Sequence, residues 1–252
     1  MTKIILHGYM GSMGRAVTAL ADKSRSAEIV AGVDAASPRP ANFPTFSHIT
    51  ECDMPADVIV DFSMAQAVPG VISYAVEKRR AAVICTTGLD RPCEEAIMAA
   101  SEKIPVFKSA NMSIGVSLLA NILKRISKTL YDDGFDIEVT EAHHRLKIDA
   151  PSGTALMFAD IINGAAGPLE IVTDRAPRRE RRPRAEIGVH SLRGGTIVGE
   201  HSVLFAGPDE TIELRHRAAS KEVFAAGALK AAVFIAGKPP GLYDMESIMD
   251  QL

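Results

Sequence analysis

Two adjacent histidines and a nearby lysine are the residues of this chain best suited to chemistry. They lie in the stretch EAHHRLKIDAPSGTA, where His143 and His144 are followed by Lys147. An imidazole can carry or release a proton near neutral pH, and a lysine ammonium adds a positive charge. A pair of histidines at a strand end is more often structural when it stands alone. Beside an anion-binding helix start, the same residues predict a site that passes a proton to a negatively charged substrate.

The residues directly after this stretch have the pattern of a helix start. Ser152-Gly153-Thr154 precede the apolar run ALMFADII, which predicts that Ser152 is the N-cap. The amides of Gly153 and Thr154 would then lie at the positive end of the helix, where the first amides have no partner within the helix. Because Gly153 has no side chain, an anion can approach closely. The alternative is a simple capping motif, but next to His143 and Lys147 we favour a binding site for carboxylates.

A glycine-rich loop near the N-terminus indicates a nucleotide site. GYMGSMGR places glycines at positions 8, 11 and 14, between the predicted strand KIILHGY and the predicted helix GRAVTALADKS. Glycines at such a turn let the backbone approach a pyrophosphate, whose charge is stabilised by the helix N-terminus. The GxxGxxG spacing is a variant of the usual GxGxxG pattern, so the assignment depends on the strand before the loop and the helix after it.

Asp34 indicates which dinucleotide binds. It ends the second predicted strand, EIVAGVD, and lies 20 residues after Gly14. A carboxylate at this point accepts hydrogen bonds from the ribose hydroxyls of NADH and repels the 2′-phosphate of NADPH. The next three residues, AAS, offer no arginine to bind that phosphate, although Arg39 could reach it. We therefore expect NADH as the preferred cofactor and keep NADPH as an alternative.

Two further stretches end predicted strands on the same edge of the sheet. Thr86-Thr87-Gly88 follow AAVIC, and Ser109-Ala110-Asn111 follow IPVFK. Each is an ordinary loop when taken alone. Because ligands of open α/β sheets bind at the carboxyl ends of the strands, both stretches are expected to border the nicotinamide half of the cofactor.

The order of the predicted elements divides the chain into an α/β part and an α+β part. Strands and helices alternate in the first part, which is typical of a parallel sheet; the further strands are DVIVDFS, AAVICTTG and IPVFKSAN, and the helices are QAVPGVISYAVEKRR and CEEAIMAASEK. After about residue 115, the amphipathic helix SLLANILKRISKTL precedes the strand FDIEVTEAHH. Between Ala185 and Arg217, the strand patterns EIGVHSL, TIVGEHSVLF and TIELRHR follow one another without a helix, which predicts a meander. The helix KEVFAAGALKAAVFIAG comes next, and LYDMESIMDQL ends the chain.

The composition excludes several classes of protein. The 252 residues are 47% apolar and 23% charged, which argues against disorder. A net charge of −3 gives no indication of nucleic acid or a membrane surface as a partner, and no apolar run is long enough to span a bilayer. Cys52, Cys85 and Cys93 form no CxxC pair, and no residues have the spacing of metal ligands, so no metal is expected. Since the N-terminus also lacks a signal-peptide core, we expect a reducing, cytoplasmic location.

An arginine-rich segment, RAPRRERRPRAE, holds six arginines between Arg175 and Arg184. Such a run can bind nucleic acid, but no aromatic residue that could stack on a base lies among the arginines. We interpret the segment as a solvated, mobile loop, with electrostatic guidance of an anionic substrate as a second reading. His190, His201 and His216 are scattered along predicted strands and are interpreted as structural.

The chain closely resembles the bacterial 4-hydroxy-tetrahydrodipicolinate reductases, also called dihydrodipicolinate reductases, over nearly its whole length. The motifs that carry the resemblance are GYMGSMGR, DFSMAQAV, CTTG, SANMSIGV, EAHHRLKIDAPSGTA, RGGTIVGEH and KEVFAAGALKAAVFIAGKPPGLYDM. The pattern EAHHxxKxDAPSGTA is highly specific. The resemblance implies reduction of a cyclic, 4-hydroxylated imine dicarboxylate by NADH or NADPH, with loss of water, to tetrahydrodipicolinate in lysine and diaminopimelate biosynthesis.

The resemblance also implies roles for individual residues. His143 matches the family's proton donor, and Lys147 matches its second donor and charge anchor. The substrate-binding positions correspond to His144, Gly153 and Thr154, with Ser152 in the same loop. The positions of the cofactor contacts correspond to Gly8, Tyr9, Met10, Gly11, Ser12, Met13, Asp34, Cys85, Thr86, Thr87, Ser109, Ala110, Asn111 and Met112.

Two of these positions depart from the family pattern. The family commonly has glycine where this chain has Cys85, and an aromatic residue where it has Met112. Neither change removes a charge or a proton donor. The nicotinamide pocket is therefore expected to be either looser here or repacked, methionine being an adaptable filler.

For architecture, the resemblance implies a Rossmann dinucleotide-binding domain built from residues 1–114 and 218–252. Residues 115–217 would form an α+β substrate-binding and oligomerisation domain with an open mixed sheet. The exposed face of that sheet must be covered, and the family is usually tetrameric, so a homotetramer is expected.

Two other functions stay open at this stage. One is an NAD-dependent dehydrogenase that acts on another amino or imino acid. The other is a non-catalytic NAD(H)-binding module. This second function predicts a missing proton donor or anion site, whereas His143, Lys147 and the Ser-Gly-Thr loop are all present.

Overall fold

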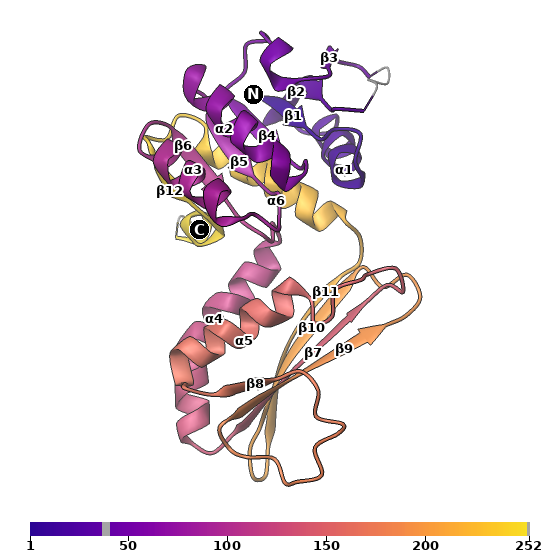
Figure 1. Ribbon diagram of the computed structural model, residues 1–252, viewed down its shortest axis with the longest axis vertical. Coiled ribbons are helices and arrows are strands. Elements are labelled where there is room, and N and C mark those ends of the chain that lie inside the picture. Colours follow the sequence, from indigo (N-terminus) through magenta and orange to yellow (C-terminus); the bar gives the residue numbers. More distant parts are fainter. Residues whose placement is uncertain (37–40, 251–252) are drawn as a thin grey trace. The chain divides into compact units, whose positions relative to one another are not determined.

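The chain forms two compact units (Figure 1). The computed structural model describes residues 1–36 and 41–250, so Arg39, which was considered above for NADPH, lies outside the described residues. Unit 1 comprises Met1–Ile114 and Lys221–Leu252, and unit 2 comprises Gly115–Ser220. The chain returns to unit 1 after Ser220 and not after residue 217, because strand β11 (Thr211–Ala218) and the bend that follows it still belong to unit 2.

A parallel sheet forms the centre of unit 1. Among the described residues its strand order is β12-β6-β5-β4-β1-β2-β3, and every neighbouring pair is parallel. The strands are β1 (Thr2–His7), β2 (Ala27–Val33), β3 (Thr45–Phe46), β4 (Val58–Asp61), β5 (Ala81–Ile84), β6 (Pro105–Lys108) and β12 (Gly241–Tyr243). The strand order reverses between β1 and β4, which is the place where nucleotides bind in open α/β sheets. The expected Rossmann arrangement is thus confirmed.

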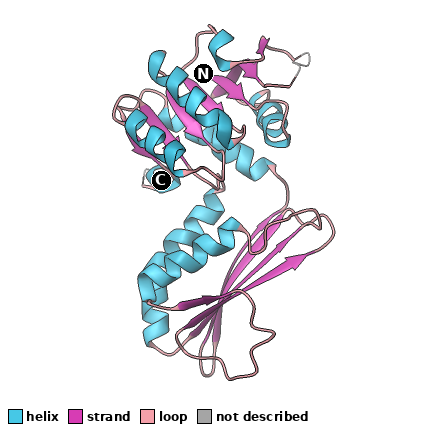
Figure 2. Ribbon diagram, viewed as in Figure 1, coloured by secondary structure: helices cyan, strands magenta, loops and turns pink. Residues whose placement is uncertain are grey.

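Helices cover both faces of this sheet, because successive strand residues point to opposite sides. Ile4 and Leu6 of β1 pack with α1 (Ser12–Ala21), α6 (Glu222–Ile235) and α7 (Met245–Met249). Ile5 packs with α2 (Val68–Glu77) and α3 (Arg91–Ser101) on the other face. Figure 2 shows helices on both sides of these strands. Two short 3₁₀ helices, η1 (Ile49–Glu51) and η2 (Ala65–Ala67), precede β4 and α2. Burial on both faces explains why these strands are apolar without interruption.

Unit 2 packs two helices against one face of a mixed sheet (Figure 1). Among the described residues its strand order is β11-β10-β7-β9-β8, and the helices are α4 (Ile114–Asp132) and α5 (Gly153–Ala166). The other strands are β7 (Asp136–His143), β8 (Glu170–Val172), β9 (Glu186–Arg193) and β10 (Gly199–Ala206). Ile137 and Val139 of β7 share one buried cluster with Leu123 of α4 and Phe158 of α5. The odd-numbered residues of β7 therefore face the helices.

The predicted meander of β9, β10 and β11 is wrong. β10 and β11 do form an antiparallel hairpin, but β7 lies between β9 and β10, antiparallel to β10 and parallel to β9. The glycine pair after β9 does not close a hairpin, since the Gly194 amide donates to the carbonyl of His143 at 2.9 Å, at the end of β7. Because β7 lies between β9 and β10, both of its edges have hydrogen-bonding partners. Its inward residues Ile137, Val139 and Glu141 are buried.

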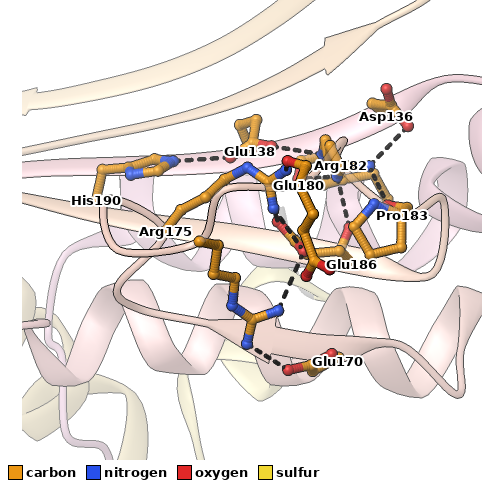
Figure 3. Close-up of polar contacts among 11 residues, drawn as sticks. Asp136, Glu138, Glu170, Arg175, Glu180, Arg182, Pro183, Glu186 and His190 are labelled. Carbon is orange, nitrogen blue, oxygen red and sulfur yellow. Dashed lines mark hydrogen bonds and ion pairs between the residues drawn. The ribbon is translucent and has the colours of Figure 1, made fainter.

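Part of the arginine-rich loop is bound to the sheet of unit 2, so its interpretation as a solvated loop is wrong for Arg175, Arg178 and Arg182. Arg182 donates to Glu138 at 2.8 Å and to Asp136 at 2.7 Å, and Arg175 donates to both carboxylate oxygens of Glu186 at 2.9 and 3.0 Å (Figure 3). Arg178 donates to Glu170, and Arg184 donates to the Tyr131 carbonyl. Acidic residues of β7, β8 and β9 thus neutralise Arg175, Arg178 and Arg182. Arg179, Arg181 and Arg184 are exposed.

Candidate active site

The inward row of β7 continues beyond the core and carries the expected proton donor. Glu141 and His143 follow two core residues on the same face of the strand. Neighbouring strands extend this row, since β10 places His201 opposite Glu141 and β9 places Arg193 opposite His143. One end of the sheet therefore gathers a carboxylate, two imidazoles and a guanidinium.

Glu141 accepts hydrogen bonds from several residues around it, and it is only 1% exposed. Its Oε2 lies 2.6 Å from Nδ1 of His143, Arg193 donates to both oxygens at 2.7 and 2.8 Å, and the Ser152 amide donates to Oε1 at 3.1 Å. Burial by itself raises the pKa of Glu141, but hydrogen bonds from Arg193, Ser191 and His143 outweigh burial and lower the pKa to about 2. Glu141 is therefore a carboxylate at neutral pH.

Opposing effects act on the imidazole of His143. Burial lowers its pKa, the hydrogen bond and charge of Glu141 raise it, and the charges of Lys147 and Arg193 lower it further; the net direction is downward. The ring also has little spare room. A Cβ added at Gly199 of β10 would lie 3.1 Å from Nε2 of His143. Glycine at position 199 therefore leaves the space that this nitrogen needs.

The helix start after the histidines is confirmed. Ser152 is the N-cap of α5, and its Oγ accepts a hydrogen bond from the Ala155 amide at 3.3 Å. The same Oγ lies 3.0 Å from Nε2 of His201, whose ring stands edge to face with that of His143 at a centroid distance of 5.2 Å. Burial, followed by the nearby His143, lowers the pKa of His201 to about 4. His201 is thus a neutral member of the site, a contact that the sequence analysis missed.

The loop between β7 and α5 places the remaining expected residues. A Cβ added at Gly153 would meet no atom within 4 Å, so the start of α5 is open on that side. Nζ of Lys147 pairs with Oδ1 of Asp149 at 2.8 Å. Nδ1 of His144 is buried and has no hydrogen-bond partner among the described residues. A buried ring nitrogen of this kind is a ready partner for a ligand group.

In unit 1, the turn from β1 into α1 forms a backbone cradle in which only glycine fits at positions 8 and 14. Gly8 has a φ of +80°, and a Cβ there would lie 2.7 Å from the Phe62 carbonyl oxygen. A Cβ at Gly14 would lie 2.3 Å from the Gly8 carbonyl oxygen. Gly8 and Gly11, the N-cap of α1, line a cleft of about 480 Å³ together with Asp34. This backbone cradle at a helix N-terminus fits the pyrophosphate of a dinucleotide.

Asp34 is fixed at the edge of this cleft by two backbone amides. Its Oδ2 accepts from Met10 at 3.1 Å and its Oδ1 accepts from Ala36 at 3.2 Å. The carboxylate therefore joins the glycine loop to the end of β2. Tyr9, Met10, Ser12 and Met13 are the other expected residues of this loop, and Tyr9 is buried.

The two later stretches lie at the ends of β5 and β6, as expected. Thr86 donates to Oδ2 of Asp61 at 2.5 Å, and Thr87 follows it. The Ser109 hydroxyl donates to the Asn111 carbonyl at 2.7 Å, with Ala110 between them. Cys85 and Met112, the two departures from the family pattern, are both buried in the core that α6 covers.

A buried pair next to the glycine loop was not anticipated. Nδ1 of His7, the last residue of β1, lies 2.7 Å from Oδ1 of Asp61, the last residue of β4, and His7 lines the cleft. Asp61 is fully buried and also accepts from the Ser63 hydroxyl at 2.6 Å. Both residues end strands that flank the switch point, which is the signal that could have revealed them.

The two sites together define the class of protein. Within residues 1–36 and 41–250, no group of three His, Cys, Asp or Glu side chains is placed to hold a metal ion. No helix in the same ranges is long and apolar enough to cross a membrane. A glycine cradle on a Rossmann sheet is typical of a pyridine-nucleotide-dependent oxidoreductase, and the histidines and helix start of unit 2 are of the types that pass protons and bind anions.

Comparison with known proteins identifies the family. Residues 2–112 match the family model "Dihydrodipicolinate reductase, N-terminus", and residues 115–249 match "Dihydrodipicolinate reductase, C-terminus". The chain therefore belongs to the dihydrodipicolinate reductase family.

Relatives of similar length agree with this assignment. The chain is 47% identical over 250 residues to 4-hydroxy-tetrahydrodipicolinate reductase of Caldanaerobacter subterraneus subsp. tengcongensis, covering 99% of this chain and 98% of the relative. It is 46% identical over 251 residues to the reductase of Clostridium tetani, with the same coverage. Among solved structures, dipicolinate-bound dihydrodipicolinate reductase from Paenisporosarcina sp. TG-14 has a TM-score of 0.79 at 22% identity, covering 97% of each chain. At that identity, the structural match supports the fold alone.

Proposed function

We propose that this chain catalyses the reduction of 4-hydroxy-tetrahydrodipicolinate to tetrahydrodipicolinate, with loss of water, in lysine and diaminopimelate biosynthesis. Its family and the names of its full-length relatives support this activity. The observation that carries the proposal is the contact of His143 with buried Glu141 next to the start of α5. Reduction of a dicarboxylate needs a proton donor and hydrogen-bond donors for carboxylates in one place.

We infer that the substrate is held as a small cyclic dicarboxylate by the start of α5 and the loop before it. The amides of Gly153 and Thr154 lie at the positive end of a 14-residue helix, where they stabilise an anion. Lys147 adds a cation, and Nδ1 of His144 offers a further hydrogen-bonding atom. Ser152 contributes through its cap, which fixes the turn. The solved relative bound to dipicolinate, a planar dicarboxylate, is in keeping with this chemistry.

The proposed reaction adds one hydride and one proton to the substrate and releases one water. Bound reduced nicotinamide supplies the hydride. His143 supplies the proton from Nε2, because its Nδ1 is bound to Glu141. Lys147 is the second candidate donor, and its ammonium also offsets the negative charge of a carboxylate.

For the cofactor, we propose a preference for NADH over NADPH. The support is Asp34, whose carboxylate is held at the edge of the cleft by the Met10 and Ala36 amides. In that place a carboxylate binds ribose hydroxyls and repels a 2′-phosphate. The proposed cofactor contacts are Gly8 to Met13, Asp34, Cys85 to Thr87 and Ser109 to Met112.

We further propose a cytoplasmic homotetramer. The three cysteines, Cys52, Cys85 and Cys93, are free and buried, which suits a reducing compartment. In unit 2, α4 and α5 cover one face of the sheet, and self-association is the natural cover for the other. Light scattering or native mass spectrometry of the purified protein measures the assembly directly. A monomer in solution would contradict it.

An assay with the cyclic substrate tests the activity. The substrate is generated enzymatically from pyruvate and aspartate semialdehyde, and the loss of NADH or NADPH is followed. We expect turnover of this compound and none of open-chain amino acids. The double variant His143→Gln/Lys147→Met should lose most of kcat while it binds the cofactor normally. Wild-type turnover by that variant would refute the assigned proton donors, and activity on open-chain amino acids alone would favour a different dehydrogenase.

A further inference from the structure

We propose that Glu141 is the positioning residue of this site: it fixes His143 with a proton on Nδ1, so that Nε2 exchanges the proton, and it anchors the first turn of α5. The inference rests on the proposed function for the role of His143. The hydrogen bonds that support it lie wholly within unit 2. Its test can therefore be separated from the test of the reaction.

The protonation of Nδ1 follows from the state of Glu141. Its carboxyl group is ionised at neutral pH, because the hydrogen bonds from Arg193, Ser191 and His143 outweigh the effect of burial on its pKa. An ionised carboxylate can only accept hydrogen bonds. The contact of 2.6 Å between Nδ1 of His143 and Oε2 of Glu141 thus requires the proton on Nδ1. Neutral His143 then has its lone pair on Nε2, beside the space left by Gly199.

The other carboxylate oxygen of Glu141 binds the start of α5. Oε1 accepts from the amide of Ser152, the N-cap of α5, at 3.1 Å. Arg193 binds both oxygens at 2.7 and 2.8 Å, which holds the carboxylate in one orientation. One buried carboxylate therefore connects the proton donor on β7 to the anion-binding helix start. A shift of Glu141 would move both.

The charged and titratable groups around His143 come from four segments. Glu141 lies on β7, Arg193 on β9, His201 on β10, and Lys147 on the loop before α5. Of these, Glu141 is the group that favours the protonated imidazole, while Lys147 and Arg193 disfavour it. When Nε2 takes up a proton, the resulting imidazolium is paired with Glu141. When Nε2 gives up that proton, His143 returns to the neutral form with Nδ1 still protonated.

The first test compares Glu141→Gln with Glu141→Asp and the control Thr140→Ala, which changes an exposed residue of the same strand. The amide of glutamine can donate to Nδ1 and so permits the other tautomer. We expect kcat of Glu141→Gln to fall by about 100-fold or more, while the KM for the cofactor stays within about 3-fold. The alkaline limb of its kcat–pH profile should move to lower pH, because the group that favours protonated His143 is gone. Glu141→Asp should recover part of kcat, and Thr140→Ala should behave as wild type.

The second test measures the tautomer in the wild-type protein. Long-range ¹H–¹⁵N spectra of histidine-labelled wild-type protein report which ring nitrogen of His143 carries the proton, with His143→Gln providing the assignment. We expect Nδ1–H. A neutral His143 protonated on Nε2, or an unchanged kcat–pH profile in Glu141→Gln, would overturn the positioning role. If the spectra show Nδ1–H but the wild-type protein does not reduce the cyclic substrate, the proposed function fails and the positioning role stands.

Discussion

Nε2 of His201 lies 3.0 Å from Oγ of Ser152, so strand β10 and the N-cap of α5 share a hydrogen bond in the buried part of unit 2. His201 is 5% exposed, and its ring also contacts Phe158 of the core at a centroid distance of 6.0 Å. The imidazole therefore joins the helix start to the sheet while it stays neutral. A positive charge on His201, this close to His143, would oppose protonation of His143.

We expect unit 2 to lose stability on acidification, in part through His201. Burial lowers the pKa of His201 from 6.5 to about 4 in the folded chain, so the unfolded chain takes up this proton at a higher pH. The stability due to neutral His201 is then present above pH 6.5 and is lost as the pH falls towards 4. The full effect is on the order of 3 kcal/mol. His201→Gln removes the titrating group and should flatten the decline in urea-unfolding midpoint between about pH 7 and about pH 5.

The matched control for this prediction is His48→Gln, because His48 is exposed and lies in unit 1. That variant should keep the wild-type pH dependence. The same slope in His201→Gln and wild type would show that burial of His201 is not a source of acid sensitivity.

A methyl group at position 199 should impair catalysis without weakening cofactor binding. In Gly199→Ala, the new Cβ would meet Nε2 of His143 at 3.1 Å, so the imidazole must shift by a few tenths of an ångström. Displacement of a proton donor on this scale should lower kcat by about 3- to 10-fold. Gly194→Ala, where a Cβ meets no atom within 4 Å, should leave kcat unchanged. Steady-state kinetics of both variants decide the point, and equal kcat values in the two would contradict the crowding of His143.

Asp34 should set the cofactor preference. Asp34→Asn keeps one oxygen for the Met10 amide but loses the charge that, in our proposal, binds the ribose hydroxyls and repels a phosphate. We expect the KM for NADH to rise about tenfold, the loss of about 1.4 kcal/mol, whereas the KM for NADPH should stay level or fall. Asp53→Asn, at an exposed position, is the control. An equal rise of both KM values would mean that Asp34 acts only on the loop and not on the ribose.

The nucleotide unit could be predicted from the sequence because its signals are local. Ile4, Ile5 and Leu6 form an unbroken apolar run, as strands buried on both faces do, and a glycine loop and a helix follow directly. The substrate loop is equally local, since His143 and Ser152 lie on one short stretch of chain.

Arg193 and His201 could not be found in this way, because strand pairing brings them to the site. The alternation of apolar and polar residues along a strand shows which face of the sheet a residue lies on, but not which strand lies beside it. The meander prediction put β9 next to β10, whereas β7 lies between them and collects Arg193 from one side and His201 from the other. The arginine segment was misinterpreted for the same reason, since the carboxylates that bind it belong to distant strands.

Arg182 should stabilise unit 2 more than any exposed arginine of its segment. Its side chain is 17% exposed and donates to Asp136 and Glu138, which lie on the same outward face of β7, and to the carbonyls of Ile137 and Glu186. Arg182→Met keeps the aliphatic stem but leaves two neighbouring carboxylates without their shared cation, although His190 still contacts Glu138 at 2.8 Å. The ion pairs of Arg182 are neither fully exposed nor fully buried, and their contribution should lie between the values typical of surface and buried ion pairs. We therefore expect a loss of about 2 kcal/mol in the free energy of unfolding. Part of that loss should disappear at high salt, because screening weakens the repulsion between the two carboxylates.

The control Arg181→Met, at an exposed position, should change the free energy of unfolding by less than about 0.5 kcal/mol. Urea unfolding of both variants at low and high salt checks the comparison, and equal stabilities would mean that solvent, and not Arg182, satisfies this face of the sheet.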